Sequence, residues 1–176
     1  IYLTLTRDER VEKVKEVVYE AFEQVKIEDD IHEEDLPKYK EALDYEFSVI
    51  EETKELDTAD YFLFNKRMVD LAVHKYGGTL TRSGRGSASS YYINRVLGMT
   101  QVDRVTAEIP LYPERFISTA RLLENRSLPD IDYNVVSQQP FVDATRELLG
   151  DKGCYGMVAY GTLQEGEAFR NVCRSK

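Results

Sequence analysis

Residues 77–98, GGTLTRSGRGSASSYYINRVLG, decide the expected fold. Residues 78–82 favour a short strand, the glycine-rich turn 84–87 follows, and residues 87–97 predict a helix that ends at Gly98. Glycines let the backbone approach a ligand closely, and a helix beginning at Ser87 would offer free N–H groups and a positive dipole end to phosphate oxygens. Alone, the pattern favours a plain surface turn over phosphate binding, because it matches neither the P-loop nor the dinucleotide motif.

The segments on either side of this stretch are mostly helical. Apolar spacings of three and four predict helices over residues 7–26 and 36–55, and a third that begins at Thr58 or Asp60 and stops at Gly77 and Gly78. The residues expected on the buried faces of the three helices are Val11, Val14, Val18, Ala21 and Val25; Tyr39, Leu43, Phe47 and Ile50; and Tyr61, Phe64, Met68 and Leu71.

Downstream, polar and apolar residues alternate in PDIDYNVV, residues 129–136, which is typical of a strand with one polar face. A helix over residues 140–149, a second strand over 154–161 and a last helix over 163–174 are expected to follow. The predicted class is therefore α+β, with a mixed sheet backed by helices and a helical N-terminal part.

Length and composition indicate one globular domain of 176 residues. No apolar run is long enough to cross a membrane and no leader opens the chain, so we expect a soluble, cytoplasmic protein without a membrane partner. Cys154 and Cys173 are expected to be free thiols, and His32 and His74 suggest no metal site. A first residue other than Met and an uncapped end indicate a fragment of a longer protein.

The formal net charge of −9 is unevenly distributed. Residues 1–60 hold 8 Lys and Arg against 20 Asp and Glu, whereas the remainder holds 15 against 12. Every one of the 8 basic side chains between residues 77 and 150 is an arginine: Arg82, Arg85, Arg95, Arg104, Arg115, Arg121, Arg126 and Arg146. Arginine matches phosphate with a planar fork of donors. Structural ion pairs with Asp103, Glu108, Glu114 and Glu124 are an equally good explanation.

Asp130 and Asp132 are the second candidate for chemistry. Carboxylates two residues apart point to the same side of a strand, where a divalent cation would relieve their repulsion. Mg²⁺ prefers one or two protein carboxylates together with water and substrate phosphates. By themselves the two acids are more often a solvated strand face. With the glycine turn and the arginines, they make up the parts of a nucleotidyl-transfer site.

Three motifs in order carry a resemblance to a known family: GRGSA at residues 84–88, LGMT at 97–100 and PDID at 129–132. With their flanking segments, from about Tyr39 to Arg174, they resemble the palm of the bacterial DNA polymerase III alpha subunits, the C-family replicative polymerases of DnaE and PolC type. The resemblance implies a palm of the polymerase-beta-like nucleotidyltransferase fold over residues 1–160, with the start of the helical thumb at 161–176.

The resemblance also implies a function and a set of site residues. Gly86 and Ser87 would contact the incoming triphosphate, and Arg85 and Arg115 would be further phosphate contacts. The residues implied as metal-binding and catalytic are Asp130 and Asp132, holding two Mg²⁺ ions. The expected partners are primer–template DNA, a dNTP and, through regions outside this chain, other replisome subunits.

The resemblance further places a third catalytic aspartate on a later palm strand, beyond Lys176, so the 176-residue chain alone is expected to be inactive in primer extension. Asn134 occupies the position of the third acid of the DnaE-type DIDID run, which keeps an oxygen but loses a charge. Two alternatives are a degenerate, non-catalytic module that binds nucleic acid or a partner, and a metal-dependent phosphohydrolase, for which the usual clusters of His and acidic residues are missing.

Overall fold

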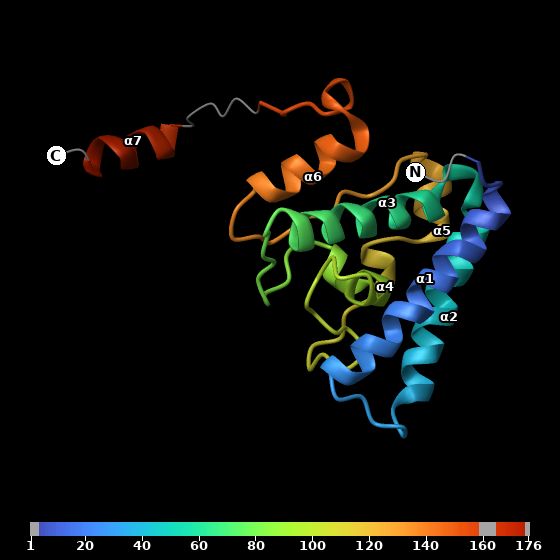
Figure 1. Ribbon diagram of the computed structural model, residues 1–176. Helices are drawn as coiled ribbons and strands as arrows, with labels where there is room; N and C mark the ends of the chain where they lie inside the picture. The colour runs from blue at the N-terminus through green and yellow to red at the C-terminus, as the bar shows by residue number, and fades with distance from the viewer. Residues whose placement is uncertain (1–3, 159–164, 175–176) are drawn as a thin grey trace.

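The computed structural model describes residues 4–158 and 165–174 of the chain, and its architecture is helical (Figure 1). Helices α1 (Arg7–Glu28) and α2 (Leu36–Glu52) lie side by side, joined by the acidic loop 29–35. Helix α3 (Thr58–Asp70) packs on α1 and continues into a π-helical turn, η2 (Leu71–Lys75). The remaining elements are η1 (Lys54–Leu56), η3 (Ala88–Ser90), α4 (Tyr92–Val96), η4 (Pro113–Arg115), α5 (Thr119–Asn125), α6 (Gln139–Leu149), η5 (Asp151–Gly153) and α7 (Glu165–Arg174).

The predicted first three helices are confirmed, with small shifts of their ends. Helix α1 begins where a capping box closes, since the Thr6 hydroxyl accepts from the Glu9 N–H and the Glu9 carboxylate accepts from the Thr6 N–H. All four residues expected on the buried face of α2 are buried, namely Tyr39, Leu43, Phe47 and Ile50. In α1, Ala21 was expected to be buried and is only partly so, whereas its neighbour Phe22 is buried.

The predicted mixed sheet is wrong. Within residues 4–158 and 165–174, the only β-pairing is one isolated antiparallel bridge between Leu80 and Val135. Two backbone bonds flank it, from Thr81 N–H to the Asn134 carbonyl at 2.8 Å and from Val136 N–H to the Thr79 carbonyl at 3.0 Å. The two segments therefore meet as the sequence suggested. They pair over too few residues to make a sheet. A two-stranded pairing is marginally stable by itself, and none of the described segments adds a third strand to it.

Three further predictions are corrected or fall partly outside the described residues. The helix expected over residues 87–97 is split into η3 and α4, because Tyr91 adopts an extended conformation with φ −122° and ψ 121°. The strand expected over 154–161 is absent from its described part, residues 154–158, and its remainder lies outside the description. The last helix is α7, and Leu163, its expected first residue, also lies outside. Helix α6 confirms the prediction for residues 140–149 to within one residue.

Glu46 joins α2 to α4 in the middle of the core, where its side chain is fully buried. Its two carboxylate oxygens accept from the backbone N–H groups of Tyr92 at 2.8 Å and Ile93 at 2.7 Å, so a buried carboxylate caps the start of α4. The Arg104 guanidinium donates to the same carboxylate at 2.7 Å. This network fixes α4, and with it the end of the segment that carries the glycine turn.

The titration of Glu46 should appear in the pH dependence of stability. Burial raises its pKa to about 7, against the opposing effects of Arg104 and the two N–H donors. A carboxyl with a raised pKa binds its proton more tightly when folded, so its stabilisation is present below the usual 4.5 and is lost as pH rises through about 7. We expect the free energy of unfolding in urea to fall between about pH 5 and about pH 8, by at most about 1.4 kcal/mol per pH unit.

Two variants check the assignment of this slope. The Glu46→Gln protein cannot titrate at this position and should lose the slope, whereas Glu41→Gln, an exposed position on the same helix, should keep it. Equal slopes in the wild type and in Glu46→Gln would contradict the assignment.

None of the helices in the described part of the chain is both long and apolar enough to span a membrane.

Candidate phosphate and metal site

The glycine turn packs directly on one of the two candidate metal ligands. Gly86 has φ +67°, and a Cβ built there would fall inside van der Waals contact with Oδ2 of Asp132 and 3.2 Å from its Cβ and Cγ. Gly84 is equally confined, since a Cβ there would overlap the Ser89 hydroxyl and a methyl group of Val102. From the sequence, the turn and the acids were expected to be parts of one nucleotidyl-transfer site, and in the structure Gly86 lies beside Asp132.

A second set of contacts fixes the beginning of the turn to the acidic segment. The Asn134 side-chain amide donates to the Ser83 hydroxyl at 2.7 Å and to the Ser83 carbonyl at 3.1 Å. The backbone bond between Thr81 and Asn134 lies beside it. Asn134 therefore joins the two halves of the site through its N–H₂ group. Sequence reasoning considered only its oxygen and missed this contact and Ser83.

Asp130 and Asp132 both face solvent, while Ile131 and Tyr133 between and after them pack against the core. This alternation is the one that the sequence predicted, although the segment is not a strand. Both carboxylates therefore lie on the exposed surface, in a segment that is neither helix nor strand. They make no ion pair within the described residues, which leaves their oxygens available to a cation.

Two hydrogen bonds join the aspartate segment to helix α3. The Tyr61 hydroxyl donates to the Pro129 carbonyl at 2.8 Å, and the Tyr133 hydroxyl donates to Oδ1 of Asn65 at 2.7 Å. Burial, and then the negative charge of Asp130, raise the pKa of Tyr61, so its hydroxyl stays protonated and donating. Sequence reasoning treated Tyr61 only as part of an apolar stripe. Tyr61 and Asn65 lie one helical turn apart, and this spacing could have indicated that they share a polar contact.

The expected contribution of a helix N-terminus at Ser87 is not present. Ser87 precedes η3, a 3₁₀ turn of three residues, and its side chain makes no capping hydrogen bond. So short an element carries little dipole. Phosphate binding at this turn would depend on the backbone N–H groups that the glycines expose, together with nearby arginines.

Six of the eight arginines between residues 77 and 150 make no ion pair within the described part of the chain. Arg95 pairs with Glu28 and Asp29, and Arg104 pairs with Glu46. None of Asp103, Glu108, Glu114 and Glu124 forms an ion pair there, so the structural-pair explanation is wrong for these four acids. Arg85 is exposed in the glycine turn, and Arg115 ends η4, which packs against η3 directly after the turn.

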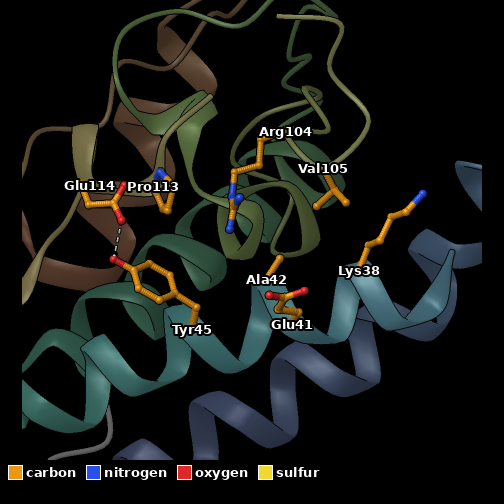
Figure 2. Close-up of a pocket in the computed structure, with 8 residues that line it drawn as sticks. All are labelled: Lys38, Glu41, Ala42, Tyr45, Arg104, Val105, Pro113 and Glu114. Carbon is orange, nitrogen blue, oxygen red and sulfur yellow. Dashed lines mark hydrogen bonds between the residues drawn. The ribbon is translucent and has the colours of Figure 1, made fainter. Parts of the chain in front are cut away.

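A hollow of about 370 Å³ lies between α2 and residues 104–114, next to η4 (Figure 2). The Tyr45 hydroxyl donates to Glu114 at 2.7 Å across it, and this bond and burial raise the Tyr45 pKa to about 12. Its two basic residues are already engaged, Arg104 with Glu46 and Lys38 with Asp35 at 2.7 Å. The Tyr45–Glu114 bond therefore fixes η4, which carries Arg115, and the hollow offers no separate anion site.

The donor set fits a partial Mg²⁺ site. Asp130 and Asp132 are hard oxygen donors on an exposed surface, the type that Mg²⁺ prefers. No three His, Cys, Asp or Glu side chains are grouped for metal binding within the described residues. The pair would hold a cation together with substrate phosphates, water or a ligand from elsewhere.

The sequence of the chain matches a known protein family. The family model of the bacterial DNA polymerase III alpha NTPase domain matches residues 11–176. The DNA polymerase III subunit alpha of Staphylococcus aureus (strain MRSA252) is 28% identical over 138 residues, which is 77% of this chain and 12% of that protein. The probable DNA polymerase YorL of Bacillus subtilis (strain 168) is 32% identical over 100 residues, 56% of this chain and 7% of that protein. The chain thus spans about an eighth or less of the length of these relatives.

Proposed function

Because the chain belongs to the bacterial DNA polymerase III alpha NTPase domain family, we propose that it carries part of the catalytic centre of a DNA-directed DNA polymerase. The observation that supports the proposal is the packing of Gly86 on Asp132, which puts the glycine turn next to one of the two acids. The proposed reaction is transfer of a deoxynucleotide from a dNTP to the 3′-hydroxyl of a primer on template DNA.

Each site residue has a proposed role in this reaction. The backbone at Gly86 and Ser87 binds the triphosphate, and Arg85 and Arg115 neutralise its charge. Asp130 and Asp132 are the residues that would hold two Mg²⁺ ions. Such ions, when bound, activate the attacking hydroxyl and stabilise the leaving pyrophosphate.

The arrangement of the site in the whole protein is also proposed. Residues 1–160 form the palm part that presents the carboxylates, and residues 161–176 lead toward the thumb. Other replisome subunits would bind elsewhere, and the proposed location is the cytoplasm. The third catalytic aspartate that the family resemblance implies is not among these residues, so the 176-residue chain alone is proposed to be inactive in primer extension.

The roles of the two arginines are tested by replacing each with Ala in the full-length protein. Losing one charged hydrogen bond to phosphate should raise the KM for dNTP about tenfold, with a smaller change in kcat. Arg146→Ala is the matched control, because Arg146 lies on α6 and also makes no ion pair within the described residues. An unchanged KM in both Arg85→Ala and Arg115→Ala would remove these residues from the site.

A further inference from the structure

The side-chain hydrogen bonds that hold residues 129–133 within the described part of the chain are both made with α3. The backbone of residues 130–133 makes no hydrogen bond within the described part of the chain. At one end of this stretch the Pro129 carbonyl accepts from Tyr61, and at the other the Tyr133 hydroxyl reaches Asn65. The peptide group that leads into Asp130 and the residue that follows Asp132 are therefore both fixed to one helix.

These contacts form one connected chain on α3. The Asn65 amide accepts from Tyr133 through its oxygen and donates through its nitrogen to the Tyr61 carbonyl at 2.8 Å. The Tyr133 ring stacks on Phe141 of α6, with ring centroids 6.0 Å apart. The Tyr133 hydroxyl and the Asn65 amide are thus paired, and the Tyr61 hydroxyl is satisfied separately by the Pro129 carbonyl. Polar groups that are satisfied in this way rigidify the segments they join.

A segment without backbone hydrogen bonds of its own would otherwise be less constrained at Asp130 and Asp132. A divalent cation needs its carboxylates in place before it binds, because ordering them on binding costs affinity. The two hydroxyl contacts flank the pair at its two ends. They control the spacing of the carboxylates without contacting the cation.

We propose that Tyr61, Asn65 and Tyr133 are positioning residues that preset the Asp130–Asp132 pair for divalent-cation binding. The proposal rests on the proposed function, in which these two aspartates hold the metal. It assigns to α3, through Tyr61 and Asn65, an effect on metal affinity that involves no contact with the cation.

The test uses Tyr61→Phe and Tyr133→Phe in the full-length protein, since each removes one hydroxyl and keeps the ring. The matched control is Tyr39→Phe, whose partly buried hydroxyl donates to Asp103 at 2.7 Å on another part of the core. Mn²⁺ alone is titrated by electron paramagnetic resonance, without DNA or dNTP. Only those Mn²⁺ sites are counted that are lost in the double variant Asp130→Asn, Asp132→Asn. Thermal unfolding of every variant is followed in parallel.

We expect Tyr61→Phe and Tyr133→Phe each to weaken Mn²⁺ binding about tenfold, because each loses a contact that fixes the chain next to a proposed metal ligand, and Tyr39→Phe to leave it unchanged. In primer extension, the Mg²⁺ concentration at half-maximal rate should rise by a similar factor, with the rate recovering at saturating Mg²⁺. Wild-type Mn²⁺ affinity in both variants, with or without a lower melting temperature, would overturn the proposal.

If one variant fails to fold, the other decides alone, because the two hydroxyls act at opposite ends of the pair. If the double Asn variant removes no Mn²⁺ site, the proposed function itself fails. That result is distinguishable from failure of the positioning role, in which the double variant removes sites and the Phe variants do not.

Discussion

Replacing Asp130 and Asp132 together with Asn should lower templated primer extension by the full-length protein about 10³-fold or more, while the protein remains folded. Both carboxylates are exposed and make no ion pair within the described residues, so their removal leaves no buried charge unpaired. The loss would come from the divalent cations that the pair is proposed to hold, because their positive charge would stabilise the reacting phosphate. One stabilising group of this kind is worth about 10²–10³-fold. Steady-state extension on a primed template, with circular dichroism to monitor folding, measures both quantities.

Glu124→Gln is the matched control, because Glu124 is an exposed carboxylate on α5 without an ion pair in the described part of the chain. It should extend primers at the wild-type rate. Extension that persists in the double Asn variant would contradict the assignment of the aspartates. A wild-type protein that binds DNA but never extends a primer would favour the degenerate, non-catalytic module instead.

The second large effect is expected from Gly86→Ala. The new methyl group would meet the Asp132 carboxylate, and alanine at φ +67° carries strain of about 1–2 kcal/mol. The carboxylate is the end of a flexible side chain and can turn away, so the protein should stay folded. A displacement of about 1 Å at a reacting centre costs about 10²-fold in rate, and we expect kcat/KM for dNTP to fall by that factor.

Gly156→Ala is the control for a glycine in open space, since a Cβ at Gly156 has no heavy atom within 4 Å and its φ is not in the left-handed region. It should leave kcat/KM unchanged. If Gly86→Ala extends primers as well as Gly156→Ala does, the close packing of the turn on Asp132 has no catalytic role.

The helices were predictable because each is marked by local signals. The valines of α1, the capping Thr6 and the glycines after Tyr76 act within a few residues of one another. The lack of a sheet among the described residues was not predictable in this way, since a strand depends on partners far away in the sequence. Alternation at residues 129–136 correctly indicated which side chains face solvent. It could not show that only Val135 would find a bridging partner among the described residues.

The site was predictable in its parts and not in its supports. The residue types at Gly86, Asp130 and Asp132 have few chemical uses, and the resemblance of the motifs implied a shared site. The supporting contacts of Tyr61, Asn65 and Ser83 depend on the path of the chain, which no local pattern encodes. The unpaired arginines are a similar case, because composition cannot distinguish a free guanidinium from a paired one.

The central claim is that the glycine turn and the aspartate pair form one site, and a double-mutant cycle tests it most directly. Affinity for a Mn²⁺–dNTP complex is measured for the full-length protein, for Gly86→Ala, for Asp132→Asn and for the double variant. Because the two residues are in contact, their effects should be strongly non-additive, with the double variant binding about as weakly as the weaker single variant. Losses that add in full, as for distant and independent positions, would contradict the claim.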